Sequence, residues 1–279
     1  MDRGVLGPQH EGYRDMLEQL RQRASGHRDA SWRMPVSPGE MTIIAPSFNR
    51  VLHHADCPAL PGGAVNLSLD VTAIEARYNA KRPEIMHVDG LLTEEALQSI
   101  RRFCLDSTIW KRDYPNGYLG AFLGDGFACP LLLQIAEELR LKFPGVFHQH
   151  KLTQSWAFKY DSALTGLNMH ADAAAVNVNF WITPDEANLD PDHGGLVVWD
   201  REAPRDWSFK EYNNAKNEPK VLAWLTQQGA QTVTIPYRCN RAVIFNSDLF
   251  HATDRISFKE GYENRRVNIT LLYGRRGDA

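Results

Sequence analysis

The hydrophobic pattern changes its period near residue 150, and this change constrains the fold more than any other feature of the chain. Downstream of it, apolar and polar residues alternate, as they do in short strands with one buried face. Eight strand-like segments can be counted: 155–160, 166–170, 175–182, 195–200, 231–236, 242–246, 250–254 and 266–274. Eight antiparallel strands after a helical prelude predict a mainly β (α+β) fold. The specific prediction is a double-stranded β-helix (jelly roll) or another two-sheet barrel, with packing helices from the N-terminal part on one outer face.

The helices of the prelude are recognised by their spacing. One is predicted to begin after Thr93, a good N-cap residue, and a second to end before Pro144, because apolar residues recur there every three or four positions. The earlier part is rich in Pro and Gly, and a helix over 13–24 is its clearest element. We therefore expect residues 1–85 to form an N-terminal extension of unclear structure, packed on or capping the core. Residues 86–279 are expected to form the jelly-roll domain.

A long insert at 201–230 interrupts the predicted strands and is rich in aromatic residues, including Trp207 and Trp224. Loops of this length are often lids over a site, although a peripheral unit with a small core of its own is a fair alternative.

Composition limits the partners. The formal net charge of −3 comes from 31 basic and 34 acidic residues mixed along the chain, so no basic stripe predicts nucleic-acid binding. No stretch approaches the roughly 20 apolar residues of a membrane span, and the first residues lack a signal-peptide pattern, so we expect a cytoplasmic protein that binds no membrane. The four cysteines are scattered and predict reduced core thiols. The oligomeric state is left open.

Candidate metal ligands lie in "LNMHADAAAVNVNFW", where His170 and Asp172 are two positions apart. Alternate residues of an extended chain share a face, so the two side chains can converge on one metal ion, although ordinary hydrogen-bonding partners have the same spacing. A second imidazole, His251 in "NRAVIFNSDLFHATD", could complete the set from a neighbouring strand. Two imidazoles and one carboxylate suit non-haem Fe(II), because three coordination positions stay open. No His-Glu-x-x-His motif is present, and iron is favoured over zinc.

Arg266 opens the last predicted strand, "RRVNITLLYG", and alternation places it on the same face as Thr270. A guanidinium buried beside the metal needs an anion, and its two-pronged geometry fits a carboxylate. In the strand at 175–182, Asn179 lies on the polar face, where it either contacts a ligand or belongs to a satisfied polar network. The competing pair His148 and His150 follows a helix stop and is expected to be exposed.

These pieces together resemble the Fe(II)- and 2-oxoglutarate-dependent dioxygenases, especially their prolyl hydroxylase-like branch, over roughly residues 86 to 274. The resemblance depends on "HAD", "GGLVVWD", "NRAVIFNSDLFHAT" and "RRVNIT", which occur in the family's order. The family has a tyrosine about ten residues before the His-x-Asp motif, where this chain has Tyr160. The chain departs from the pattern in one place, because the family's basic residue often follows the second histidine by about ten positions, where Gly261 lies here. Thr270, four residues after Arg266, favours Arg266 over Arg265 as its equivalent.

The resemblance implies a role for each residue. His170, Asp172 and His251 would bind Fe(II), and Arg266 would bind the distal carboxylate of 2-oxoglutarate with help from Tyr160, Thr270 or Asn179. Family chemistry consumes O2, releases succinate and CO2, and hydroxylates an unactivated C–H bond. Related halogenases lack the carboxylate of Asp172, so its presence favours hydroxylation. The substrate is left open between an amino acid, a peptide or protein side chain and a natural product. A non-catalytic metal or 2-oxoglutarate sensor, or an interaction module on the same fold, remains the alternative function.

Overall fold

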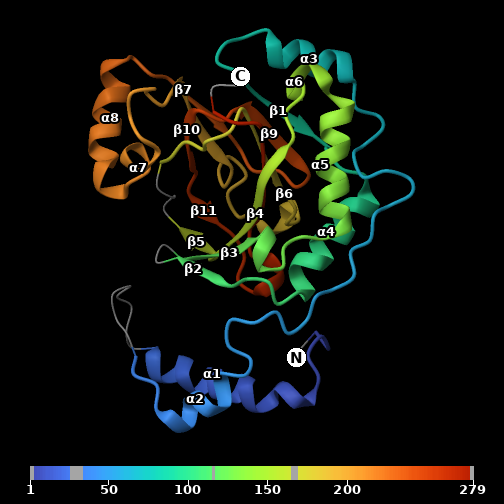
Figure 1. Cartoon of the computed structure of the whole chain (residues 1–279), viewed down its shortest axis with the longest axis vertical. Coiled ribbons are helices and arrows are strands. Elements are labelled where there is room, and N and C mark those ends of the chain that lie inside the picture. The colour runs from blue at the N-terminus through green and yellow to red at the C-terminus, as the bar shows by residue number, and fades with distance from the viewer. Residues whose placement is uncertain (1–2, 26–33, 115–116, 165–168, 277–279) are drawn as a thin grey trace.

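A seven-stranded antiparallel sheet forms the centre of the computed structural model, which describes residues 3–25, 34–114, 117–164 and 169–276 (Figure 1). Its strands run in the order β1-β9-β6-β12-β4-β3-β2. Their bounds are β1 Ile85–Asp89, β9 Arg241–Asn246, β6 Val176–Trp181, β12 Val267–Tyr273, β4 Leu152–Tyr160, β3 Tyr118–Phe122 and β2 Arg112–Tyr114.

A smaller sheet, ordered β10-β7-β8, and the pair β11-β5 complete the β structure. The bounds are β10 Leu249–Thr253, β7 Leu196–Glu202, β8 Thr232–Ile235, β11 Ile256–Ser257 and β5 Ala163–Leu164. Buried side chains from both sheets, including Trp181, Val198 and Phe245, form one apolar cluster. The predicted jelly-roll class is confirmed.

The alternating pattern located the strands well. Each predicted segment except 166–170 contains a strand. Most of that segment lies outside the described residues, and His170 at its end forms an isolated bridge with His251. The pattern missed β2 and β3, a hairpin whose strands are short and include Gly120.

Helices cover the outer face of the large sheet. Alternate residues of the strands, such as Ile269 and Leu271 of β12, join apolar residues of α4 (Glu94–Asp106) and α5 (Pro130–Lys142) in the largest core cluster. Thr93 caps α4 as predicted, its Oγ1 accepting a hydrogen bond from the Ala96 N–H at 3.3 Å. The shorter helices of this region are α3 (Val71–Asn79) and α6 (Pro144–Phe147), and single turns lie at η2 (Leu123–Asp125), η3 (Asp185–Ala187) and η5 (Tyr262–Asn264).

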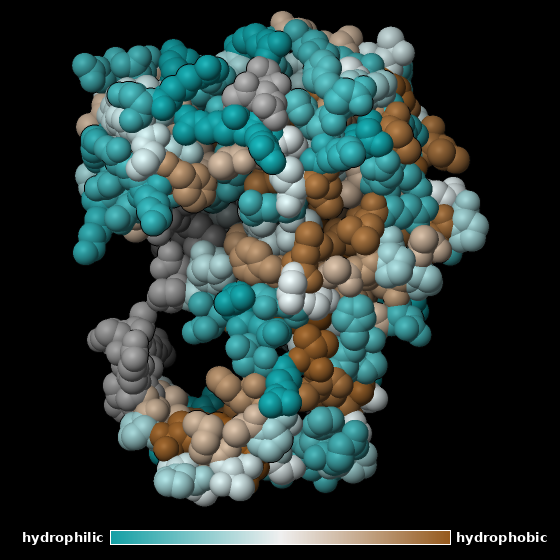
Figure 2. Space-filling model, in the orientation of Figure 1, coloured by the Kyte–Doolittle hydropathy of each residue, from teal (hydrophilic) through white to brown (hydrophobic). Residues whose placement is uncertain are grey.

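The N-terminal residues fall into two parts with different packing. Cys57, Ile74 and Tyr78 lie in the largest core cluster, so the second part is built into the body. The first part, η1 (Pro8–His10), α1 (Glu11–Ala24) and α2 (Pro38–Ile44), forms an arm that stands away from the body around an open hollow (Figures 1 and 2). At the start of the arm, Arg3 forms an ion pair with Asp106 of the body, with Nε and Oδ1 2.7 Å apart. The division of the chain at residue 85 stays a prediction.

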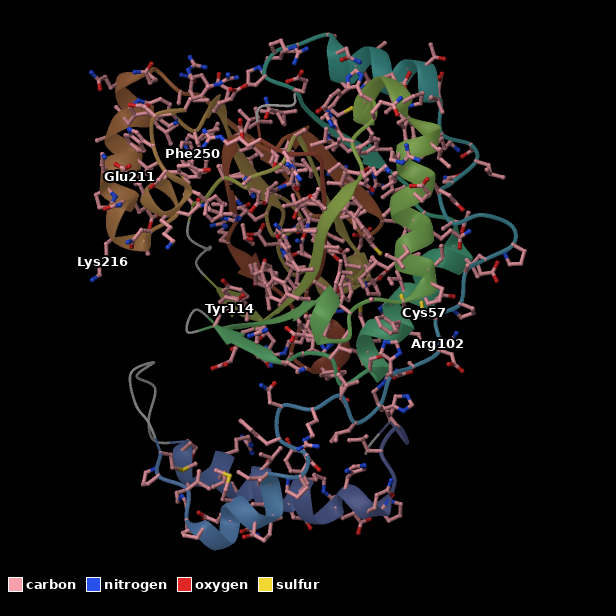
Figure 3. All side chains as sticks on the ribbon, in the orientation of Figure 1. Cys57, Arg102, Tyr114, Glu211, Lys216 and Phe250 are labelled. Atoms are coloured by element: carbon pink, nitrogen blue, oxygen red, sulfur yellow. The ribbon has the colours of Figure 1, made fainter. Side chains whose placement is uncertain are left out.

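The insert at 201–230 folds against the smaller sheet. It contains α7 (Phe209–Tyr212), η4 (Ala215–Asn217) and α8 (Glu218–Gln227), which lie on the side of the molecule opposite α5 (Figure 1). Rings of Tyr212 and Trp224 contact Phe250 of β10, with centroid distances of 6.0 and 6.2 Å. Figure 3 shows Phe250 beside this unit, and Glu211 and Lys216 at its outer side.

No helix in the described part of the chain is both long and apolar enough to cross a lipid bilayer.

Candidate functional site

The three predicted metal ligands converge at one end of the barrel. His251 comes from β10, and His170 and Asp172 come from the segment before β6. Reciprocal backbone hydrogen bonds hold the two histidines together, from His170 N–H to His251 O at 3.0 Å and from His251 N–H to His170 O at 2.8 Å. One ligand atom from each of the three residues lies within 4.8 Å of the others. Among the described residues this is the one cluster of its kind.

The ring of His251 is held in the orientation that a metal ligand needs. Its Nδ1 lies 3.0 Å from the Leu249 carbonyl oxygen, which can only accept, so the proton is on Nδ1 and the Nε2 lone pair faces the site. Nε2 lies 3.5 Å from Oδ2 of Asp172. The ring is buried and rests edge-on against Phe245 at 4.9 Å, which restricts its rotation.

Asp172 is held as a carboxylate although it is buried. Its Oδ2 accepts a hydrogen bond from Asn177 Nδ2 at 2.8 Å. Burial raises the pKa of the Asp172 carboxyl, but the adjoining side chains of His251 and His170 and the hydrogen bond from Asn177 outweigh it and hold this pKa below its usual value. Two imidazoles and one ionised carboxylate facing a common point fit a divalent metal ion with open coordination positions.

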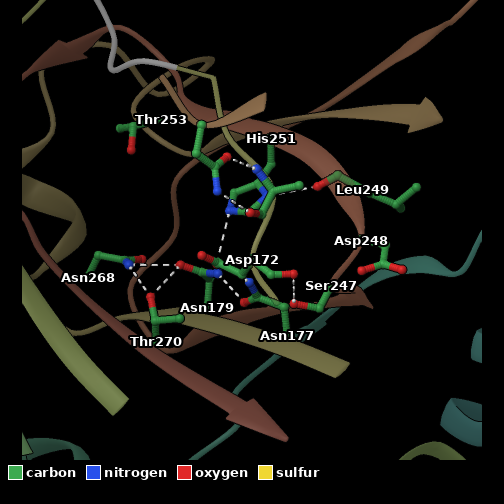
Figure 4. A network of polar contacts seen from close by, with 12 residues as sticks. Asp172, Asn177, Asn179, Ser247, Asp248, Leu249, His251, Thr253, Asn268 and Thr270 are labelled. Carbon is green, nitrogen blue, oxygen red and sulfur yellow. Dashed lines mark hydrogen bonds and ion pairs between the residues drawn. The ribbon is translucent and has the colours of Figure 1, made fainter. Parts of the chain in front are cut away.

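A polar network continues from Asp172 across the large sheet (Figure 4). Asn179 donates from Nδ2 to Asn177 Oδ1 at 2.6 Å, and its Oδ1 accepts from Asn268 at 2.8 Å and from Thr270 at 3.0 Å. The side chain of Asn179 is therefore engaged on both ends, and the position of Thr270 is fixed through it. This geometry favours a positioning role for Asn179.

Arg266 is completely buried beside this network, and its guanidinium is only partly satisfied. Nε donates to Gly194 O at 2.6 Å and Nη2 to Gly195 O at 3.2 Å. Both glycines are needed, because Gly194 has a φ of +84° and a Cβ on Gly195 would lie 1.9 Å from Ile235 O. Nη1 of Arg266 is buried and has no hydrogen-bond partner among the described residues.

Aromatic rings surround the same guanidinium. The Arg266 carbon Cζ lies 4.7 Å from the ring centroid of Tyr160 and 5.5 Å from that of Trp181. The Tyr160 hydroxyl lies 3.3 Å from Thr253 Oγ1. Within the described residues, Nε1 of Trp181 is a second buried donor without a partner. A cation with one unpartnered donor, beside a second unpartnered donor on Trp181, is a setting that fits an anionic carboxylate.

Asn213 of the insert is a site residue that the sequence did not reveal. Its Oδ1 accepts from Ala171 N–H at 3.0 Å, and its Nδ2 donates to Ala171 O at 2.9 Å. Ala171 lies between His170 and Asp172, so the insert holds the backbone that carries two of the three candidate ligands. An asparagine among many polar residues of the insert gives no local signal of this contact.

The competing histidines lie elsewhere. The rings of His148 and His150 contact each other with a centroid distance of 6.0 Å, and the cluster of metal-ligand candidates in the described chain does not include them.

A cavity of about 420 Å³ opens onto the ligand cluster. The lining residues are Tyr118, Phe122, Gln154, Trp156, Phe158, Tyr160, Met169, His170, Asp172, Ala173, Asn179, Leu196, Phe209, Asn213, His251, Thr253, Asn268, Thr270 and Leu272. A larger cavity of about 1070 Å³ lies between the arm and the body, away from the ligand cluster.

Solved structures share this architecture. The non-heme alpha ketoglutarate dependent epimerase SnoN from nogalamycin biosynthesis aligns with a TM-score of 0.53 at 13% identity, over 74% of this chain and 83% of that one. The non-heme alpha ketoglutarate dependent carbocyclase SnoK from the same biosynthesis aligns with a TM-score of 0.52 at 12% identity, over 76% and 86%. A prolyl-4-hydroxylase from Pseudomonas putida gives 0.44 at 15% identity, over 74% and 99%. No protein-family profile and no curated protein sequence matches the chain.

The chain therefore has the fold of the iron- and 2-oxoglutarate-dependent oxygenases, and the resemblance expected from its motifs is confirmed at the level of the fold.

Proposed function

We propose that the protein is an iron(II)- and 2-oxoglutarate-dependent oxygenase that hydroxylates an unactivated C–H bond. The observation that carries this proposal is the pairing of two features in one site. The ligand atoms of His170, Asp172 and His251 lie within 4.8 Å of one another. The buried Arg266 packs against Tyr160, which lines the same cavity, and has a donor without a partner. The first feature fits a metal ion, and the second fits the distal carboxylate of a keto acid.

Each residue has a task in this proposal. His170, Asp172 and His251 hold iron on one face, and Asn177 orients the carboxylate. Arg266 binds the distal carboxylate of 2-oxoglutarate, with Trp181 as a second donor. Tyr160 and Thr270 border the cosubstrate. With both groups bound, the site would supply oxidative decarboxylation of 2-oxoglutarate, with O2 as oxidant, to drive oxidation of a substrate C–H bond.

The donor set and the fold support the two cofactors. Zinc sites more often use Cys ligands or a third His, whereas two imidazoles and one carboxylate leave room for a chelating keto acid. One structure of the epimerase SnoN, which aligns with a TM-score of 0.51 at 14% identity, is a complex with Fe3+, alpha ketoglutarate and nogalamycin RO. On these grounds we propose a small-molecule substrate for this chain.

Anaerobic addition of Fe(II) and 2-oxoglutarate to the protein tests the proposal. A weak visible charge-transfer band should appear, because a keto acid bound to iron creates a new metal-to-ligand transition. Asp172→Ala and His251→Ala should abolish the band, whereas His148→Ala and His150→Ala should leave it unchanged. Retention of the band in Asp172→Ala or His251→Ala would show that the three-ligand assignment is wrong.

Admission of air then separates an enzyme from a sensor. An oxygenase should release succinate, and this release should rise when its substrate is present. A non-catalytic binding protein should show the band but form no succinate. Product analysis by mass spectrometry distinguishes hydroxylation, which adds one oxygen atom, from another oxidation.

A further inference from the structure

Six aromatic side chains gather on the cavity face of β2, β3 and β4, and we call them the aromatic wall: Tyr114, Tyr118, Phe122, Trp156, Phe158 and Tyr160. Tyr118 stacks on Tyr114, with centroids 4.4 Å apart and an interplanar angle of 7°, and on Tyr160 at 5.5 Å and 25°. Phe158 meets Tyr118 edge-on at 5.1 Å. The rings thus form one continuous surface.

The backbone builds this surface by alternation. Residues 156, 158 and 160 share one face of β4, and residues 118 and 122 share that face of β3. Gly120 between them leaves the space that the rings use, because a Cβ there would lie 3.1 Å from ring atoms of both Phe158 and Tyr114. A larger residue at 120 would push these rings apart.

The aromatic wall borders the cavity that contains the metal ligands. Each of its members except Tyr114 lines that cavity, and Phe209 of the insert lines it as well. Figure 3 shows Tyr114 at the outer edge of the sheet, on β2. The rings of Tyr118, Phe122 and Phe158 are only half-buried, so they present apolar surface to the cavity. Such a surface beside convergent polar groups is typical of a ligand site.

The charges of the cavity restrict the ligand further. Asp172 is the single carboxylate among the lining residues that the structure describes, and they include no Lys or Arg. Arg266 lies completely buried behind Tyr160, and the proposed function assigns it to 2-oxoglutarate. A free amino acid would bring an ammonium and a carboxylate into this cavity. Among the described lining residues, Asp172 is already assigned to the metal, and no Lys or Arg is present to meet the carboxylate. Burying such unpaired charges is strongly unfavourable.

We infer that the substrate is an uncharged molecule with a flat ring system, which lies against the aromatic wall with its reacting carbon toward the metal ligands. This inference rests on the proposed function and names its substrate class. Stacking of a ring on Tyr118 and Phe158 supplies orientation, and the neutral amide of Gln154 can bind a hydroxyl or carbonyl group of the substrate.

Two probes with the same ring test the inference. The full chain with Fe(II) and 2-oxoglutarate is titrated anaerobically with 2-naphthalenemethanol, which is neutral, and with 3-(2-naphthyl)-L-alanine, which carries both charges. The measured signal is the shift of the charge-transfer band. We expect 2-naphthalenemethanol to shift the band with a saturable response and to bind at least about tenfold more tightly than the amino acid.

Variants of the aromatic wall locate the bound ring. Phe158→Leu and Tyr118→Leu should each weaken 2-naphthalenemethanol by about threefold to tenfold, because an aromatic contact is replaced by an aliphatic one. Leu119→Ala is the matched control, since Leu119 lies on the same strand but borders the other cavity. Each variant is first checked for a normal band, and two wall variants are used so that loss of folding in one leaves the test intact.

The outcomes separate this inference from the proposed function. Absence of the band in the parent protein overturns both. A normal band that 2-naphthalenemethanol does not shift overturns the inference alone. Equal or tighter binding of the amino acid also overturns it, as does unchanged affinity for 2-naphthalenemethanol in both wall variants.

Discussion

Two buried cations, Arg266 and Lys159, lie on opposite faces of the same sheet. Tyr160 of β4 faces the cavity and stacks on Arg266, whereas its neighbour Lys159 points to the helix-covered side. Among the described residues, neither cation has a carboxylate as its hydrogen-bond or ion-pair partner. Each face of the sheet therefore buries a cationic side chain that no carboxylate neutralises, which is unfavourable in a low-dielectric interior.

Lys159 reduces its charge within the protein. Its Nζ donates to Tyr262 Oη at 2.7 Å and lies 4.3 Å from the centroid of the Trp110 ring. Burial lowers the pKa of the Lys159 ammonium to about 7, with the positive charges of Arg265 and Arg3 adding to the effect. The group can therefore be neutral near physiological pH, and the structure needs no external partner for it.

Arg266 cannot reduce its charge in this way. Burial lowers the pKa of its guanidinium, but Tyr160, Tyr237 and Asp254 oppose this shift, and a guanidinium stays protonated in proteins. Its charge and its unpartnered Nη1 therefore remain in the interior, which supports the proposal that an anion binds there. The comparison teaches that the choice of Arg or Lys decides whether burial can remove the charge, because only Lys can shed its proton at accessible pH.

The largest effect is expected at Arg266. Arg266→Ala should weaken 2-oxoglutarate binding by on the order of 2 to 5 kcal/mol, the usual cost of removing one partner of a buried charge pair, and should leave iron binding nearly intact. Arg266→Lys should recover only part of the loss, because a point charge cannot make the two-pronged contact. Titration of 2-oxoglutarate measures both.

Arg265→Ala is the control for this prediction. Arg265 precedes Arg266 but forms an ion pair with Asp161 at the surface. Its replacement should change affinity little. If Arg265→Ala weakened 2-oxoglutarate binding more than Arg266→Ala did, the assignment of the two arginines would be reversed. The comparison of Arg266 with Lys159 would then no longer hold.

The next largest effect is expected at Asn213. This prediction tests whether the proposed metal ligands are held in place independently of Arg266. Asn213→Ala removes both hydrogen bonds to Ala171 and should weaken iron binding by about 10- to 100-fold, as is usual for partners that orient metal ligands. Iron affinity is measured by competition with a chelator of known strength. Asn214→Ala is the matched control, because Asn214 caps η4 instead. If both variants bind iron like the parent, the insert does not hold the site.

The third prediction concerns Lys159. Between pH 7 and about 10.4 the unfolded chain binds a proton at this lysine that the folded chain lacks, so this group makes stability rise with pH across that window. Lys159→Met should therefore stabilise the protein at pH 7 by on the order of 1 to 2 kcal/mol, and the gain should shrink as the pH approaches 10. Urea unfolding at several pH values measures this. Lys151→Met, at an exposed position, should show no such pH-dependent gain, and a gain independent of pH in Lys159→Met would contradict the explanation.

The smallest effect is expected at Trp181. Trp181→Phe keeps a ring beside Arg266 but removes the buried Nε1 donor. We therefore expect 2-oxoglutarate to bind about threefold to tenfold more weakly. Without ligand, the free energy of unfolding should fall only by the amount that the smaller ring loses in packing. Trp224→Phe in the insert is the control. Unchanged 2-oxoglutarate affinity in Trp181→Phe would leave Arg266 as the sole donor to the carboxylate.

Much of the fold could be predicted because its signals are local. Alternation along a strand depends on neighbouring residues, so β12 and its two faces followed from "RRVNITLLYG", with Ile269 in the helix-side core and Thr270 in the cavity network. The N-cap of α4 followed from Thr93 for the same reason. The β2-β3 hairpin was not predicted, because Gly120 interrupts the alternation of apolar and polar residues that a longer strand would show.

The sequence by itself determined which residue types could bind a metal and an anion, and the class of fold that carries them. Only the tertiary structure decided how they are held, because the contacts join residues distant along the chain. Gly194 O, which binds Arg266 Nε, is 72 residues away from it, and Asn213 is 42 residues from Ala171. No local pattern records such pairs. Chain packing brings the pairs together, and burial then leaves a donor of Arg266 without a partner and lowers the pKa of Lys159.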